Sequence, residues 1–378
     1  MTMPYVTQAI SNSVVLDDIR MTFREALKYQ QAPDSVPQNL HSKGFFRTYS
    51  FWTDEPKDFK LSQVFTTTVL HRASQAPKDY ITFNIPKASG GTRTIEAPEP
   101  PLKKAQRDVT DFLQDKLKVL PHNSAYAYTK GRCAYDALVT HQRRNARWFL
   151  KVDLKDFFPS ITRHVLDRRL PEVYPLDQMK QKCRISWDRL LDIAVNHDDC
   201  LPQGSPLSPV LSNLVMMDFD HTLSKILRDF EGKHYTYTRY ADDLLISCPF
   251  SFEYQPILNV IEELLEENEL GMKINYGKLR YGSHAGRNWN LGLMYNQNQQ
   301  ITIGNKKKRQ LHSLVNNFIT DYKEGNPWDI SSTQELVGKL AYLKNVEPDY
   351  YHTILKKYNT KYQANFNHYA RTILRSET

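Results

Sequence analysis

Tyr240-Ala241-Asp242-Asp243 is the stretch that decides the fold of this 378-residue chain. It lies between two largely apolar runs, Tyr235-Thr236-Tyr237-Thr238-Arg239 and Leu244-Leu245-Ile246-Ser247. Aromatic, β-branched and aliphatic residues dominate both runs, which predicts two strands joined by a tight turn. Adjacent carboxylates at the edge of an apolar hairpin repel each other, and burying them requires a compensating cation. The alternative is that Asp-Asp serves only as a turn sequence.

A third aspartate, Asp153, follows another short apolar stretch, Trp148-Phe149-Leu150-Lys151-Val152, which predicts a strand that ends at this carboxylate. If the strands are neighbours, the three aspartates form a cluster of hard oxygen ligands, which Mg²⁺ prefers. Two such ions about 3.5–4 Å apart can activate an attacking hydroxyl and stabilise a leaving pyrophosphate.

These motifs resemble those of the reverse transcriptases, whose palm carries an Asp-x-x-x-x-aromatic strand end and a Tyr-x-Asp-Asp hairpin. The resemblance implies that Asp153, Asp242 and Asp243 are catalytic. It implies that they and Leu154 hold two Mg²⁺ ions, with Mn²⁺ as an alternative, and that Tyr240 contacts the primer or template.

Phe158, five residues after Asp153, corresponds to the family's aromatic residue under the sugar of the incoming nucleotide. Its ring would exclude a ribose hydroxyl and so select deoxyribose. Phe157 is expected to face the core. The alternative is that both rings only pack.

A hairpin is predicted by the alternation in residues 80–85 and by the turn back through Gly90-Gly91. Lys87 and Arg93, on its two flanks, match the basic positions with which the family's fingers hold the triphosphate. The alternative is a solvated hairpin with surface charges. A helix is predicted after it, over residues 101–117.

Leu201-Pro202-Gln203-Gly204-Ser205-Pro206-Leu207-Ser208-Pro209 resembles the family's Pro-Gln-Gly-x-x-x-Ser-Pro segment. The resemblance implies that Gln203 and Gly204 contact the incoming nucleotide, and a helix is expected over 210–219. Gly271 to Lys278 resembles Gly-Leu-x-x-Asn-x-x-Lys, which makes Lys278 a candidate nucleotide contact and acid for pyrophosphate. A surface lysine is the alternative.

Two motifs depart from those of the retron enzymes, bacterial reverse transcriptases that copy their own small RNA. Asp136-Ala137 stands in place of Asn-Ala, and His141 lies one residue too far along the signature. Asn290-Leu291-Gly292 replaces Val-Thr-Gly in the hairpin that grips the primer, where Leu291 and Gly292 are candidate contacts.

The positive charge of the chain is concentrated toward its C-terminus. Residues 301–378 contain 12 Lys or Arg against 7 Asp or Glu, which is +5 of the net +8. A basic helical lobe can follow the phosphates of a duplex. Candidates for this contact are Lys306, Lys307, Lys308 and Arg309, although the same run could be solvated surface.

The amino-acid composition narrows the kinds of site and the cellular location that can be expected. Hydrophobic residues make up 40% of the chain, and the four cysteines show no paired spacing, so neither a zinc site nor a disulfide framework is predicted. No apolar run approaches the ~20 residues of a membrane span, and no signal pattern is evident, so a cytoplasmic protein without a membrane partner is expected.

The resemblance covers about residues 80–360 and implies an α+β right-hand polymerase fold with fingers, a ferredoxin-like palm built on an antiparallel sheet, and a helical thumb. The expected domains are an N-terminal extension (1–60), fingers (61–147), palm (148–300, with a fingers segment at about 165–210) and basic thumb (301–378).

The implied function is RNA-directed DNA synthesis from a dedicated structured non-coding RNA, with dNTPs as substrates and an RNA–DNA duplex as product. A retron-type enzyme in anti-phage defence fits best, with room for an effector or toxin protein as partner. The alternatives are a defence-associated or unclassified bacterial reverse transcriptase outside the retrons, and a catalytically silent RNA-binding protein.

Overall fold

The computed structural model describes residues 78–87, 90–284, 289–296 and 298–375. The predicted extension (1–60), with its expected helix over 16–29 and aromatic patch at 45–52, lies outside these residues. The chain divides into two compact units. Of the described residues, the first unit contains those up to Cys133, Leu150–Ser247 and Phe252–Tyr281, and the second contains Ala134–Phe149, Cys248–Ser251 and those from Gly282 onward.

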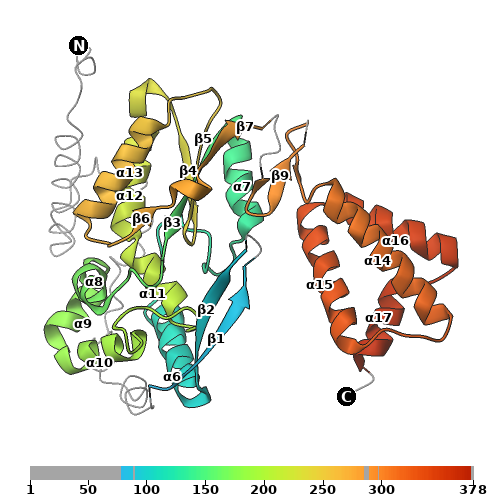
Figure 1. The fold of residues 1–378 in the computed structure, drawn as a ribbon, viewed down its shortest axis with the longest axis horizontal. Coiled ribbons are helices and arrows are strands. Elements are labelled where there is room, and N and C mark those ends of the chain that lie inside the picture. Colours follow the sequence, from blue (N-terminus) through green and yellow to red (C-terminus); the bar gives the residue numbers. More distant parts are fainter. Residues whose placement is uncertain (1–77, 88–89, 285–288, 297, 376–378) are drawn as a thin grey trace, which may run out of the picture. The chain divides into compact units, whose positions relative to one another are not determined.

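A β-sheet forms the centre of the first unit (Figure 1). Its strands lie in the order β4 (Thr236–Tyr240), β5 (Asp243–Cys248), β3 (Trp148–Lys155) and β6 (Lys273–Ile274), and β7 (Arg280–Ser283) pairs with β3. The β4–β5 pair is antiparallel with Tyr240 opposite Asp243, so the connecting turn is Ala241-Asp242. The hairpin predicted from the sequence is therefore confirmed.

Two helices pack against this sheet and against each other: α12 (Met217–Arg228) next to β4, and α13 (Gln255–Glu267) next to β6. The apolar side chains of α13 recur at helical spacing and are buried, whereas Glu262 and Glu266 are exposed. This amphipathic pattern can be read directly in the sequence of the helix.

The prediction of a single helix over residues 210–219 is wrong. The structure has α11 (Ser208–Val215), a break at Met216, and then α12. Met216 has ψ near 0° (φ −81°, ψ 1°), which ends the first helix. Because apolar side chains on both sides of the break are buried, hydrophobic periodicity gives no sign of it.

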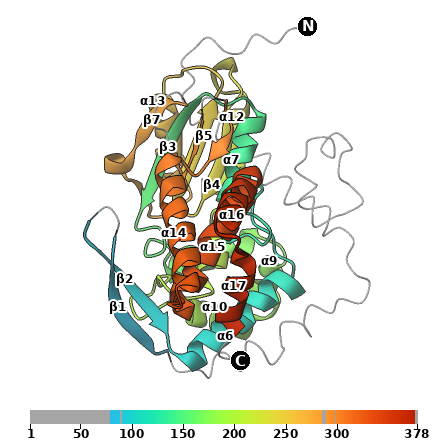
Figure 2. The same ribbon diagram turned by 90° about the vertical axis from the view of Figure 1, so that its right-hand side faces the viewer.

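A two-stranded antiparallel hairpin, β1 (Tyr80–Pro86) with β2 (Thr92–Pro98), leads into α6 (Pro100–Asp111) (Figure 2). The predicted helix over 101–117 is confirmed, although its last turn, Phe112–Lys116, is π-helical. A group of short helices lies next to α6: α10 (Arg184–Ala194) packs on α6, on α8 (Arg163–Arg169) and on α9 (Leu176–Lys182), and α11 packs on α8.

The second unit combines α7 (Ala134–Arg143), a small sheet and four helices. The sheet has the order β10 (Ile301–Thr302), β9 (Leu293–Tyr295), β8 (Trp289–Asn290). The helices pack on one another as a bundle (Figures 1 and 2): α14 (Asn305–Lys323), α15 (Ile330–Val346), α16 (Pro348–Tyr362) and α17 (Phe366–Arg375). Within the described residues, no helix combines the length and apolar character that crossing a membrane requires.

His141, on α7, is fully buried, and its ring centroid lies 6.1 Å from that of Phe149. Burial lowers the pKa of this imidazole to about 3. The folded protein therefore keeps His141 neutral at pH values where the unfolded chain, with an ordinary pKa near 6.5, takes up a proton.

We expect His141 to make the protein less stable as pH falls below about 6.5, by roughly 2 kcal/mol between pH 7 and pH 5. Substituting His141→Gln should flatten this dependence, whereas His368→Gln at an exposed site should not. Urea unfolding at pH 7 and pH 5 measures the difference. An undiminished loss of stability in His141→Gln would contradict the assignment.

Candidate active site

The turn between β4 and β5 brings two of the three aspartates to one end of the sheet. Ala241 adopts a left-handed conformation (φ 58°), which is uncommon for a residue with a side chain and characteristic of two-residue hairpins. The Asp242 carbonyl accepts a hydrogen bond from the Leu154 amide of β3 (3.0 Å). The turn is thereby attached to the strand that carries Asp153.

Asp153 is buried and held by two side chains from the segment after β6. Its Oδ1 accepts from Asn275 Nδ2 (2.9 Å), and its Oδ2 accepts from Lys278 Nζ (2.9 Å). Asp243 Oδ1 in turn lies 3.1 Å from Lys151 Nζ, on β3. Lys278 was predicted from the sequence as a site residue, whereas no role was predicted for Lys151 or Asn275.

The electrostatics of the cluster follow from burial and repulsion. Burial, followed by the charge of Asp243, raises the pKa of Asp242. Burial also raises the pKa of Asp243, although the ammonium of Lys151 opposes this. The hydrogen bond to Asp153 raises the pKa of Lys278. The site thus holds more negative charge than the buried carboxylates tolerate on their own.

Among the described residues, no three His, Cys, Asp or Glu side chains are arranged as they stand to hold an ion. Lys278 and Lys151 each neutralise one carboxylate of the cluster instead. The three aspartates nevertheless suit a divalent cation, because carboxylate oxygens are the ligands that such ions prefer. The raised pKa values of Asp242 and Asp243 would fall if a positive ion were bound beside them.

Comparison with known proteins identifies the family. Residues 85–314 match the model of the family described as reverse transcriptase (RNA-dependent DNA polymerase). The chain belongs to the reverse transcriptase family.

Its relatives include the Retron Ec73 reverse transcriptase of Escherichia coli, 30% identical over 76% of this chain and 88% of the relative. The Retron Ec83 reverse transcriptase of the same organism is also 30% identical, over 75% and 88%. A putative COX1/OXI3 intron 2 protein of Saccharomyces cerevisiae is 26% identical over 51% of this chain and 29% of that protein. The chain is an RNA-directed DNA polymerase with the right-hand polymerase fold, and the two relatives that match about three quarters of its length are named retron reverse transcriptases.

In this reverse transcriptase, the two phenylalanines after Asp153 have different surroundings. Phe157 is buried, as expected, whereas Phe158 is half-buried with its ring at 71° to that of Phe157. The ring of Phe158 also lies 6.2 Å from that of Tyr128, a residue that the sequence analysis did not single out.

Gln203 and Gly204 are joined to the β1–β2 hairpin through the backbone. The Gln203 carbonyl accepts from the Glu96 amide (2.8 Å), and a Cβ placed on Gly204 would lie 2.7 Å from the Glu96 carbonyl oxygen. Gly204 also has φ 132°, so both its conformation and this close approach require glycine. At the other end of the hairpin, Lys87 and Arg93 are exposed.

In the second unit, the predicted primer-gripping hairpin is β8–β9. Its turn is Leu291-Gly292, and both residues have positive φ, as a two-residue turn of this kind demands. Asn290 is buried, and within the described part of the chain neither polar atom of its side chain has a hydrogen-bond partner.

The basic run at the start of α14 does not act as one surface. Lys306, Lys307 and Arg309 are exposed, and Lys307 Nζ donates to the Gly292 carbonyl (2.8 Å). Lys308, however, pairs with Glu347 and lies 4.3 Å from the ring centroid of Tyr350. Lys308 therefore links α14 to the start of α16.

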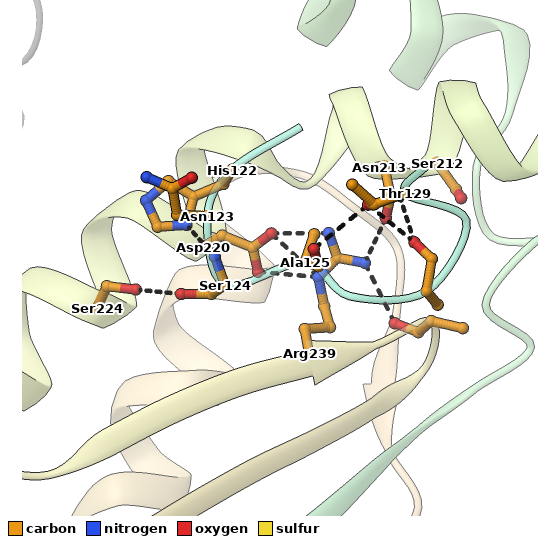
Figure 3. Close-up of polar contacts among 12 residues, drawn as sticks. His122, Asn123, Ser124, Ala125, Thr129, Ser212, Asn213, Asp220, Ser224 and Arg239 are labelled. Atoms are coloured by element: carbon orange, nitrogen blue, oxygen red, sulfur yellow. Dashed lines mark hydrogen bonds and ion pairs between the residues drawn. The ribbon is translucent and has the colours of Figure 1, made fainter. Parts of the chain in front are cut away.

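A buried ion pair supports the Ala241-Asp242 turn (Figure 3). The Arg239 guanidinium, fully buried on β4, donates to both carboxylate oxygens of Asp220 on α12 (Nη2–Oδ2 2.7 Å, Nε–Oδ1 2.8 Å). Its Nη1 donates to Asn213 (3.1 Å) and to the Ala241 carbonyl (3.2 Å), directly before Asp242. Arginine before the turn was visible in the sequence, but its partners on α11 and α12 were not.

We expect Arg239→Met to cost about 3–5 kcal/mol of folding stability, because it leaves Asp220 buried without its partner. The double substitution Arg239→Met/Asp220→Leu should recover much of this loss, since no lone charge remains. Chemical denaturation measures both.

The matched control is Arg168→Met, which removes an exposed ion pair with Glu269 and should cost less than about 1 kcal/mol. Equal losses from Arg239→Met and Arg168→Met would contradict the role given to the buried pair.

Proposed function

We propose that this reverse transcriptase synthesises DNA at the cluster of Asp153, Asp242 and Asp243. The observation that carries the proposal is that Asp153 binds Lys278 and Asp243 binds Lys151, while burial and the charges of both aspartates raise the pKa of Asp242, in a chain of this family. The aspartates and the Leu154 backbone would hold two Mg²⁺ ions, or Mn²⁺. When bound, such ions lower the pKa of the primer hydroxyl and neutralise the leaving pyrophosphate.

The protein's own groups bind and orient the nucleotide. Exposed Lys87 and Arg93 would neutralise the triphosphate, while Gln203 and Gly204 contact the nucleotide and its template base. Lys278 would donate a proton to pyrophosphate. Its hydrogen bond to Asp153 raises its pKa, so the ammonium is protonated at neutral pH.

The nucleic acid is proposed to be a structured non-coding RNA that serves as template and primer, with an RNA–DNA duplex as product. The support is that the relatives are named retron reverse transcriptases. Tyr240, Leu291 and Gly292 would contact the primer or template. Lys306, Lys307 and Arg309 would follow duplex phosphates, whereas Lys308 is occupied by Glu347.

We propose that the enzyme is cytoplasmic and acts in anti-phage defence, with an effector or toxin protein as its partner. A defence enzyme outside the retrons is the second candidate, favoured by Asp136 and by Asn290-Leu291, which depart from the retron signatures. Sequencing the nucleic acid that co-purifies separates the two, because a covalently joined RNA–DNA product indicates a retron.

We expect Asp242→Asn to reduce nucleotide incorporation by at least about a thousandfold, since it removes ligand charge. RNA affinity should change less than twofold. The melting temperature should rise at neutral pH: a carboxyl group with a raised folded-state pKa stabilises the protein when protonated and loses that contribution as pH increases, whereas Asn stays neutral.

Primer extension, RNA binding and thermal melting measure these effects, with exposed Asp108→Asn as the control that should change none of them. Substantial synthesis by Asp242→Asn in Mg²⁺ would overturn the catalytic assignment.

Phe158→Ala should open the space under C2′ of the incoming nucleotide and so admit ribonucleotides. A clash of ~2–4 kcal/mol corresponds to a roughly 30- to 1,000-fold change in the ratio of kcat/KM for dGTP and GTP. Phe157→Ala should instead destabilise the buried core by about 3–5 kcal/mol. Equal loss with both nucleotides in Phe158→Ala would mean that the ring only packs.

A further inference from the structure

The loop at residues 123–132, in the first unit, is held in one shape by its own hydrogen bonds. Arg132 Nη1 donates to the carbonyls of Asn123 (2.8 Å) and Ala125 (3.1 Å). Thr129 Oγ1 donates to the carbonyls of Ala125 and Ala127, each at 3.3 Å. A loop with this many internal bonds presents its remaining side chains in fixed positions.

The same loop is attached to the elements that carry the catalytic turn (Figure 3). Asn213 Nδ2, on α11, donates to the Ala127 carbonyl (2.8 Å). On β4, the Arg239 amide donates to the Ser124 carbonyl (2.7 Å), and the Arg239 carbonyl accepts from the Tyr126 amide (2.8 Å). The loop and the turn are therefore positioned by the same arginine.

Tyr128 lies between two of these anchored residues, in a conformation that its side chain disfavours. Its φ is 59°, in the left-handed region, and its side chain remains 44% exposed. An aromatic residue in this region carries backbone strain, and such strain concentrates at binding and catalytic sites. Nearly half of the residue stays in contact with solvent, so core packing alone does not account for the strain.

The surroundings of Tyr128 are those of the nucleotide site. Its ring centroid is 6.2 Å from that of Phe158, the proposed sugar-contacting ring. Burial, followed by the charges of Asp242 and Tyr240, raises the pKa of the Tyr128 phenol, while Arg93 lowers it. The catalytic turn and a triphosphate-binding cation thus act electrostatically on the same phenol.

We propose that Tyr128 is a second aromatic wall of the pocket for the incoming nucleotide, packing against its sugar beside Phe158. The inference rests on the proposed function, because it takes Phe158 to mark the sugar position. Phe158 selects between sugars by excluding a hydroxyl, whereas Tyr128 contributes contact area to deoxyribose and ribose alike. The hydrogen bonds of the loop on both sides of Tyr128 keep the ring in place before the nucleotide arrives, despite the backbone strain.

Steady-state incorporation by the full-length protein on a primed template tests this. Tyr128→Gly removes the ring and suits the left-handed backbone, so the variant should melt at or above the wild-type temperature. We expect its KM for dGTP and for GTP to rise roughly tenfold, with kcat changed less than threefold and the dGTP/GTP ratio of kcat/KM changed less than threefold. Tyr128→Phe should stay within twofold of wild type in KM.

The matched control is Phe250→Ala, which removes a 69% exposed aromatic ring after the end of β5 and should leave KM unchanged. An unchanged KM in Tyr128→Gly overturns the inference, as does a loss confined to kcat. The proposed function fails separately: if Phe158→Ala leaves the dGTP/GTP ratio unchanged, the sugar site is misplaced. If Phe158→Ala changes that ratio and Tyr128→Gly leaves KM unchanged, only the role proposed for Tyr128 is wrong.

Discussion

The buried pair between Arg239 and Asp220 is the interaction on which the rest of the first unit depends. An arginine has five N–H donors, and here they reach a carboxylate on α12, an amide on α11 and the carbonyl that precedes Asp242. One side chain therefore ties two helices to the catalytic turn. Because a buried charge without its partner is strongly destabilising, the turn is positioned by the same energy that holds the fold together.

The cluster of Asp153, Asp242 and Asp243 lowers the stability of the folded protein. Burial raises the pKa values of Asp242 and Asp243, while Lys151 and Lys278 compensate only part of the negative charge. A fold selected only for stability would replace these carboxylates with neutral residues. The two lysines hold the cluster together in the protein alone, and the proposed divalent cation would bring further positive charge to the same carboxylates.

Backbone geometry positions Gly204 and Tyr128, two residues proposed to line the nucleotide site. Gly204 allows the segment after Gln203 to approach β2 so closely that a methyl group would meet the Glu96 carbonyl at 2.7 Å. Tyr128 is held by its neighbours in a conformation that it would avoid in isolation. In both places the tertiary contacts, rather than local preference, decide the backbone.

The sequence by itself determined the β4–β5 hairpin, the strand that carries Asp153 and the buried face of α13, because strand and helix periodicity are local properties. The predicted end of that strand at Asp153 is wrong, because β3 continues to Lys155. Motif order also determined the family. Only the tertiary structure decided the break at Met216, the pairing of Lys308 with Glu347, and the partners of Asp153, Asp243 and Arg239. These depend on strand register and on side-chain direction between segments up to 125 residues apart, as between Asp153 and Lys278. No local sequence pattern specifies a contact between residues so far apart in the chain. The carboxylates form a site only when folding brings these segments together.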